Sequence, residues 1–242
     1  MYPVLFVWRG YRVFSYPAML YVGLVTGLIL QTLIADRAGL PHVRVYFATL
    51  TLLPIALAGS RVLYVMAHWP EFRRARHLIW RRGEGGLAMY GGVPFMIAAS
   101  IPVLTSFRLP FWTFWDTAVF CIFAGMAFAR VGCLLNGCCA GRPTSGWFAV
   151  WLPDQSGRWE WRIPTQLLEL AVAVLLLAGA WLVVDRLDTP GQLFLSTVIA
   201  YASARVILQQ TRNDRERAGR TDLHSMISFA LILVALLFVF AR

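Results

Sequence analysis

The stretch FWTFWDTAVFCIFAGMAFARVGCLL, residues 111–135, decides the fold class of this chain. As a helix it is long enough to cross a bilayer core about 30 Å thick, which requires ~20 apolar residues. Two ionisable residues, Asp116 and Arg130, nevertheless lie within it. Charged groups at membrane depth cost free energy and are functional candidates by default. The stretch therefore predicts a transmembrane helix that carries part of a functional site.

Further stretches are long and apolar enough, or nearly so, to cross a membrane: residues 16–35, 46–69, 87–107, 165–184, 192–210 and 225–241. The 242 residues are 59% hydrophobic and only 14% charged, against roughly 25% charged in a typical soluble domain. A soluble protein of this size would need far more polar surface to cover its core. We therefore expect an all-α polytopic membrane protein with about seven transmembrane helices, built as one transmembrane domain over residues 1–242.

The chain carries a net charge of +10, and all 22 of its basic residues are arginine. A genome that favours arginine codons is one explanation of this bias. The planar guanidinium fork also matches two phosphate oxygens, which makes arginine the better residue for phosphate recognition. The basic residues lie in short segments between apolar stretches. The expected partners are therefore the membrane and its lipid headgroups, and no nucleic acid.

The four cysteines predict neither a disulfide scaffold nor a metal site. Helices in a membrane satisfy their backbone hydrogen bonds internally and do not depend on disulfides for stability. Three of the cysteines, Cys133, Cys138 and Cys139, are close in sequence. Their spacing does not match the CxxC pairs of zinc sites, and no histidine lies nearby in the sequence. We therefore expect no metal site.

Ionisable residues recur in other predicted spans, where Arg61 and Arg205 join Asp116 and Arg130. Each could form a buried structural pair, for instance Asp116 with one of the arginines. Three arginines and one carboxylate leave an excess of positive charge, however. An anion should complete the set, and lipid phosphate is available throughout the membrane.

Two glycine-rich segments flank these charges. ARVGCLLNGCCAGRPT, residues 129–144, places Arg130 and Asn136 beside several glycines, which either let a ligand approach the backbone or simply form a tight turn. GGLAMYGG, around Tyr90, has the same two interpretations, close helix packing or room for a ligand. Tyr201 and Arg205 lie four residues apart and so share one helix face.

Together these segments resemble the prolipoprotein diacylglyceryl transferase family, whose members move diacylglycerol from phosphatidylglycerol to a lipoprotein cysteine. The resemblance runs over nearly the whole chain, and Asp116 lies fourteen residues before Arg130, as in the family. The similar segments are SYPAMLYVG (a first-span tyrosine motif), GSRVLYVMAHWPEF (GxRxxYV), EGGLAMYGG (GGMxFHGG), ARVGCLLNGCCAGRPT (GRxGNFxNxExxG), IPTQLLE (HPxQLYE) and YASARVILQQTRNDRERAG (YxxxRxxxExxR).

The resemblance implies a reaction in which a thiol attacks a glycerol carbon of phosphatidylglycerol, a thioether forms and glycerol-1-phosphate leaves. It implies catalytic roles for Arg130 and Arg205, which would clamp the departing phosphate, and for Tyr90 as a possible proton acceptor. Residues implied in substrate binding are Tyr16, Arg61, Asn136, Gly141, Tyr201 and Arg212. No cofactor or metal is implied.

The chain departs from the family pattern at several positions. Tyr90 replaces the histidine of GGMxFHGG, and Cys133 and Cys138 replace the first asparagine and the glutamate of the signature. Ile163 and Gln209 replace a further histidine and glutamate. Two alternatives therefore stay open. One is a paralogue that transfers a phosphatidylglycerol-derived group to another acceptor, and the other is a non-catalytic phospholipid-binding membrane protein.

The location implied by the family is the bacterial inner (cytoplasmic) membrane, with multiple passes and an active site toward the periplasm. With seven spans, the N-terminus and the most arginine-rich loops share one side, which the positive-inside rule would place in the cytoplasm. The family implies the opposite. The positive-inside rule treats loop charges as passive, which arginines that bind lipid phosphate would not be. We follow the family, because lipoprotein modification occurs on the periplasmic face.

Overall fold

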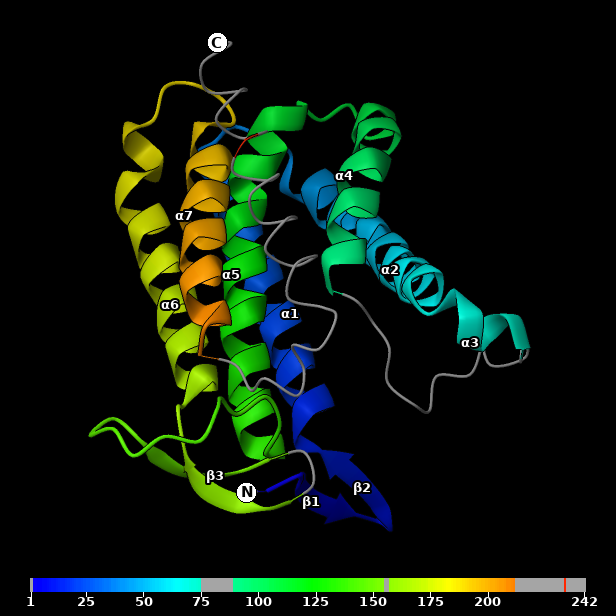
Figure 1. Cartoon of the computed structure of the whole chain (residues 1–242). Helices are drawn as coiled ribbons and strands as arrows, with labels where there is room; N and C mark the ends of the chain where they lie inside the picture. Colours follow the sequence, from blue (N-terminus) through cyan, green and yellow to red (C-terminus); the bar gives the residue numbers. More distant parts are fainter. Residues whose placement is uncertain (1, 75–88, 155–156, 212–232, 234–242) are drawn as a thin grey trace. The chain divides into compact units, whose positions relative to one another are not determined.

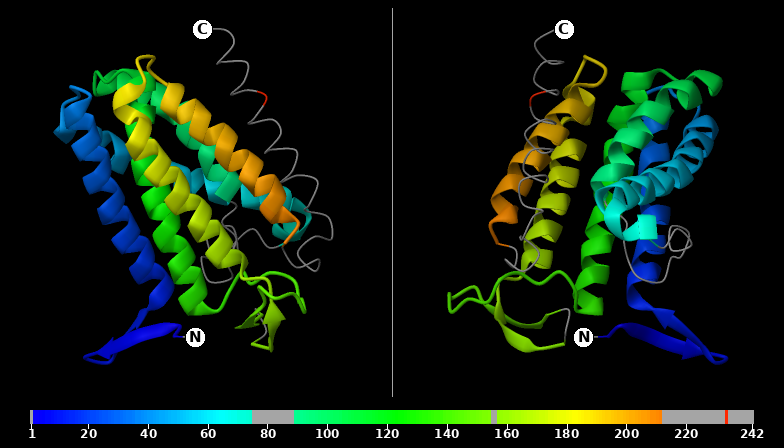
Figure 2. Two further views of the ribbon diagram at one scale, coloured as in Figure 1. Left: turned by 90° about the vertical axis from the view of Figure 1, so that its left-hand side faces the viewer. Right: turned by 45° about the vertical axis from the view of Figure 1, so that its right-hand side comes forward.

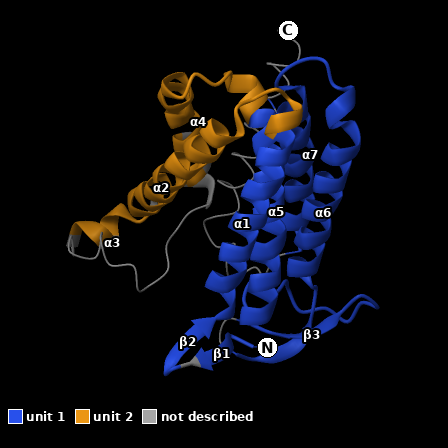
Figure 3. Ribbon diagram, turned by 180° about the vertical axis from the view of Figure 1, so that it is seen from behind, with its two compact units in different colours: residues 1–34, 115–242 blue, residues 35–114 orange. Residues whose placement is uncertain are grey.

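A computed structural model describes residues 2–74, 89–154, 157–211 and 233. The chain forms two compact units, which Figure 3 colours separately. Unit 1 comprises Met1–Ile34 and Trp115–Arg242, and unit 2 comprises Ala35–Phe114. That residues 1–242 form a single domain stays a prediction.

Unit 1 is built on four long helices that lie side by side in every view (Figures 1 and 2). They are α1 (Ser15–Arg37), α5 (Phe111–Asn136), α6 (Thr165–Val183) and α7 (Gln192–Gln209). Each contributes at least one side chain to a buried apolar core. The members of this core are Ile34, Val119, Phe120, Phe123, Ala127, Ala173, Ala180 and Leu193.

Close approach of α1 to α5 depends on two glycines spaced four residues apart. A Cβ added to Gly23 would lie 2.9 Å from Cβ of Phe128, and one added to Gly27 would lie 2.8 Å from the carbonyl oxygen of Cys121. Small residues at this spacing let two membrane helices pack backbone to backbone. The glycines therefore hold α1 against the helix that carries Arg130.

Two short antiparallel hairpins lie at one end of the unit 1 helices (Figure 1), which corrects the all-α expectation to a mostly helical fold. β1 (Val4–Trp8) pairs with β2 (Tyr11–Phe14), and β3 (Val150–Pro153) pairs with β4 (Trp159–Arg162). The first hairpin turns through Arg9 and Gly10, which both have positive φ, as a two-residue type I′ turn requires.

The backbone N–H of Tyr2 donates to the carbonyl oxygen of Leu135 at 2.9 Å. This bond ties the N-terminal hairpin to the last turn of α5. The hairpin end of unit 1 is therefore also the end at which α1 begins, α5 ends and α6 begins.

Unit 2 contains α2 (His42–Ala67), the short α3 (Trp69–Arg74) and α4 (Met89–Ser106). Helices α2 and α4 pack closely through glycine, because a Cβ added to Gly92 would lie 2.6 Å from Oγ of Ser60. This contact supports the packing interpretation of the GGLAMYGG segment at the position of Gly92.

Five described helices are long and apolar enough to cross a membrane, namely Ser15–Arg37, His42–Met66, Phe111–Asn136, Thr165–Arg186 and Gln192–Gln209. They confirm five of the predicted spans, with boundaries that differ by a few residues. The predicted span at residues 87–107 corresponds to α4, whose apolar part Phe95–Ser106 is shorter. The span at 225–241 lies outside the described residues. The chain is a multi-pass membrane protein, and the total of seven spans stays a prediction.

We expect replacement of Gly27 by alanine to lower the free energy of unfolding by about 1–3 kcal/mol, because the new Cβ overpacks the contact with Cys121. Gly179 of α6 is the matched control, since a Cβ there would meet open space. Thermal unfolding of both variants in detergent measures the difference. Equal melting temperatures for Gly27→Ala and Gly179→Ala would contradict the packing described for α1 and α5.

Candidate active site

Two arginines from different helices converge on one carboxylate in unit 1. Arg130 lies two turns before the end of α5, Arg205 lies in the last turns of α7, and Glu169 lies in the second turn of α6. Nε of Arg130 is 2.6 Å from Oε2 of Glu169, and NH1 of Arg205 forms an ion pair with the other oxygen, Oε1. The carboxylate thus bridges the two guanidinium groups.

This ion cluster is buried. The side chains of Arg130, Glu169 and Arg205 are 11%, 3% and 7% exposed. Buried charges are tolerated when they are paired, whereas removal of one partner leaves an uncompensated charge at high cost. Two guanidinium groups and one carboxylate sum to a net charge of +1. The cluster therefore keeps an excess positive charge that suits an anionic ligand.

Glu169 was not predicted as the partner of these arginines, for which the sequence suggested Asp116. The Asp116 carboxylate instead accepts hydrogen bonds from the backbone N–H groups of Gly191 and Phe194, the latter at 2.8 Å. Gly191 precedes α7 with a φ of 89° and has no side chain with which to cap it. Asp116 supplies the missing anion at the positive end of the helix.

The sequence did contain a signal for Glu169. It is the last residue of the IPTQLLE segment, which is similar to the HPxQLYE motif. Gln166 of the same segment is buried, and its Nε2 donates to the carbonyl oxygen of Cys138 at 2.7 Å. The segment therefore connects the ion cluster to the loop that follows α5.

Tyr16 and Gly132 meet at the hairpin end of unit 1. A Cβ added to Gly132 would lie 3.2 Å from Cδ2 of Tyr16, so this glycine lets the first turn of α1 rest on α5. Gly132 is two residues after Arg130 in α5, so Tyr16 packs on the part of α5 that carries Arg130. A role of Tyr16 in substrate binding stays a prediction.

Gly141 has a packing role. Its N–H donates to the carbonyl oxygen of Ile163 at 3.0 Å, and an added Cβ would lie 2.6 Å from the carbonyl oxygen of Thr211. This N–H is engaged within the protein. Gly141 also lets three segments meet at the end of the helices.

Three cysteines at the end of α5 and in the loop after it come together. The Sγ atoms of Cys133, Cys138 and Cys139 all lie within 4.8 Å of one another. Hydrogen bonds from the Cys133 and Cys139 thiols lower the pKa of the Cys138 thiol, and the side chain of Asn136 also hydrogen-bonds it. Sequence spacing alone gave no indication of this cluster.

The remaining predicted residues are less closely tied to the ion cluster. Tyr201 lies one turn before Arg205, and its ring packs edge to face on Phe123 with centroids 6.0 Å apart. Arg61 belongs to unit 2, where its guanidinium carbon lies 5.6 Å from the ring centroid of Tyr64. It also lies 5.5 Å from the ring centroid of Phe72, so Arg61 forms cation–π contacts within unit 2.

Two predicted residues cannot be related to the cluster. Tyr90 is the second residue of α4 in unit 2, and its side chain lies outside what the structure describes. Arg212 lies just beyond the described residues that follow α7.

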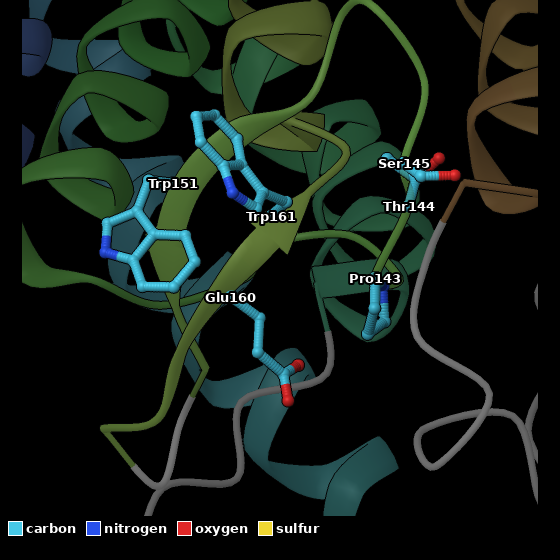
Figure 4. A pocket seen from close by; sticks show the side chains of 6 residues that line it. All are labelled: Pro143, Thr144, Ser145, Trp151, Glu160 and Trp161. Atoms are coloured by element: carbon cyan, nitrogen blue, oxygen red, sulfur yellow. The ribbon is translucent and has the colours of Figure 1, made fainter.

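A second feature is a hollow on the β3–β4 hairpin, shown in Figure 4. Its two indole rings, Trp151 and Trp161, pack edge to face with centroids 5.6 Å apart, and about half of each side chain is exposed. The other lining residues are Pro143, Thr144, Ser145 and Glu160. Exposed tryptophans next to the ends of spanning helices are typical of the membrane interface.

A multi-pass membrane protein whose buried ion cluster carries one excess positive charge is suited to bind a phosphate. Over residues 3–241 the sequence matches the profile of the family described as "Prolipoprotein diacylglyceryl transferase". The chain belongs to this family and is a transferase of this type.

Individual relatives have modest identity. The phosphatidylglycerol–prolipoprotein diacylglyceryl transferase of Bacillus cereus is 26% identical in an alignment 243 positions long, gaps included, that covers 96% of this chain and 88% of the relative. That of Geobacillus kaustophilus is 31% identical in an alignment of 238 positions that covers 93% of this chain and 86% of the relative. That of Rhodopirellula baltica is 32% identical in an alignment of 156 positions that covers 61% of this chain but only 31% of the longer relative.

Replacement of Glu169 by glutamine should lower the free energy of unfolding by about 3–5 kcal/mol, because two buried guanidinium groups then lose their shared counter-charge. Thermal unfolding in detergent measures the loss. Asp188→Asn, which neutralises an exposed carboxylate, is the control and should leave stability nearly unchanged. If both variants unfold at the wild-type temperature, the bridging carboxylate does not hold the site together.

Proposed function

We propose that this protein transfers the diacylglyceryl group of phosphatidylglycerol to the lipobox cysteine of prolipoproteins and releases glycerol-1-phosphate. The observation that carries the proposal is the convergence of Arg130 and Arg205 on Glu169, with a net charge of +1. Family membership supports it, as do relatives of that name that align over most of the chain.

The chemistry explains why an excess positive charge is useful. The thiolate sulfur of the acceptor forms a bond to the glycerol carbon, and the bond between that carbon and its phosphate oxygen breaks. The phosphate changes from a diester with one negative charge to a monoester with about two. Preorganised cations that meet this growing charge stabilise the transition state more than the bound substrate.

In this mechanism Arg130 and Arg205 hold the departing phosphate, and Glu169 is a positioning residue. The ion pair with Glu169 uses Nε of Arg130, so the terminal nitrogens of that guanidinium are outside this pair. Bidentate contacts from such nitrogens suit phosphate oxygens. Tyr16, Asn136 and Tyr201 lie in unit 1 and are proposed to contact substrate.

Tyr90, at the histidine position of the family element, is proposed to accept the thiol proton or to orient the thiol. Arg61 and Arg212 complete the proposed set of substrate-binding residues. Gly141 contributes by packing the loop, not by donating its N–H. The proposed substrates require no cofactor.

Alanine replacement of Arg130 or Arg205 should reduce transfer by roughly 10²-fold or more, the usual cost of removing one preorganised donor to a developing anion. Purified variants are assayed with labelled phosphatidylglycerol and a lipobox peptide. Arg186→Ala removes an exposed arginine beyond the end of α6 and serves as the control with unchanged activity. Full activity of the Arg130 and Arg205 variants would refute the phosphate clamp.

The identity of the acceptor is tested separately, because Cys133 and Cys138 replace polar residues of the family signature. Complementation of a strain depleted of its own diacylglyceryl transferase should restore growth. A parallel assay offers lipobox peptide, a sugar and a glycan to the wild-type protein. If only the sugar or the glycan becomes labelled, the acceptor is not a prolipoprotein and the proposed acceptor is wrong. If the protein binds lipid but labels no acceptor, it is a lipid-binding protein and not a transferase of this substrate.

We further propose a bacterial cytoplasmic membrane location with the hairpin end of unit 1 toward the periplasm. Ser145 lies beside the β3–β4 hairpin before α6, and Asp188 lies beyond the other end of the spanning segment Thr165–Arg186. In intact cells, a membrane-impermeant thiol reagent should label Ser145→Cys above the level of the parent chain, but not Asp188→Cys. The reverse pattern would invert the proposed orientation.

A further inference from the structure

The loop after α5 gathers three thiols that the proposed transfer reaction does not use. Cys133 lies in the last turn of α5, and Cys138 and Cys139 follow the helix. Their Sγ atoms all lie within 4.8 Å of one another. Among the described residues, no histidine or carboxylate belongs to this group, so its ligand atoms are sulfur only.

The backbone of the loop is shaped to produce this arrangement. Gly137 ends the helix with a φ of 72°, and its N–H donates to the carbonyl oxygen of Leu134 at 3.2 Å. The N–H of Cys138 donates to the carbonyl oxygen of Cys133 at 3.1 Å, which returns the chain to the helix end. Cys139 then has a φ of 65°. A left-handed backbone costs free energy at a residue other than glycine, and such strain is typical of functional sites.

Neighbouring residues hold the loop in place. The buried Gln166 donates from Nε2 to the carbonyl oxygen of Cys138 at 2.7 Å, which fixes the loop to α6. Cys133 is buried, whereas Cys138 and Cys139 are half-buried. Two of the three cysteines are therefore partly open to solvent.

The spacing and chemistry of the three sulfur atoms fit one soft metal ion. Three metal–sulfur bonds of about 2.3 Å in a plane place the sulfur atoms about 4 Å apart, within the observed range. Thiolates select soft ions such as monovalent copper, whereas structural zinc sites usually have four ligands.

We propose that Cys133, Cys138 and Cys139 form a binding site for one soft metal ion, monovalent copper, coordinated by their three Sγ atoms. This site lies beside the proposed phosphate site and does not depend on the transfer reaction. It replaces the expectation, drawn from cysteine spacing, that the chain has no metal site.

The test uses the full chain in detergent under anaerobic, reducing conditions. Copper(I) is titrated in competition with a chromophoric copper(I) chelator, and X-ray absorption counts the sulfur neighbours of the bound ion. The wild-type protein should withhold one equivalent of copper from the chelator, with three sulfur neighbours. Each of Cys133→Ser, Cys138→Ser and Cys139→Ser should weaken binding at least tenfold, and gel filtration shows whether each variant is folded.

Cys121→Ser is the matched control, because Cys121 lies in α5 outside the cluster and its replacement should leave copper affinity unchanged. Failure of the reduced wild-type protein to bind copper would overturn the proposal, and so would an equal loss of binding in Cys121→Ser. A parallel titration with zinc tests the choice of ion, since equally tight zinc binding would overturn the assignment to copper. None of these outcomes depends on lipid transfer, so the metal site and the transferase can fail separately.

Discussion

The carboxylate of Glu169 is the constraint on which the site depends. It lies near the start of α6 and pairs with Arg130, near the end of α5, and with Arg205, near the end of α7. Both ion pairs form only if these three helix ends lie close together. Without it, two guanidinium groups would repel one another in a buried place. With it they share one location and retain one excess positive charge. The same pairing therefore stabilises the helix bundle and leaves one excess positive charge where we propose that phosphate binds.

Other features of unit 1 serve this arrangement. Gly23 and Gly27 hold α1 against α5, while Gly132 lets Tyr16 pack on α5 near its end. At the far end of α7, Asp116 satisfies two backbone N–H groups of its first turn and so fixes the helix that carries Arg205. The helices that carry the buried charges are thus held by close glycine contacts and, at the start of α7, by hydrogen bonds to Asp116.

The sequence predicted much of the helical framework, because membrane helices are long and apolar and their hydrogen bonds join residues close in sequence. The bounds of α5 and α6, for example, differ from the predicted spans by one residue at most. The β1–β2 hairpin was missed because its strands are short, although Arg9–Gly10 is a recognisable two-residue turn. Glu169 was missed as a partner because its pairing joins residues far apart in sequence, which helix periodicity does not reveal.

The thiol cluster is another contact that the sequence pattern did not reveal, although its three cysteines are close in sequence. Cysteine spacing argued against a metal site, yet the left-handed turn at Gly137 and Cys139 folds the segment back on Cys133. Arg130 and Arg205, by contrast, stand out in the sequence as charges within apolar spans, and the structure brings both to one carboxylate. The thiol cluster and this ion cluster lie about one helical turn apart, since Cys133 and Arg130 are both in α5.

The shared location of the two arginines is tested most directly by a double-mutant cycle on phosphatidylglycerol affinity in nanodiscs. The cycle compares the wild type with Arg130→Ala, Arg205→Ala and the double variant. If both arginines hold one phosphate through one bridging carboxylate, their effects are coupled by about 1 kcal/mol or more. Losses that add to within about 0.5 kcal/mol would show two independent arginines and would contradict a single phosphate site.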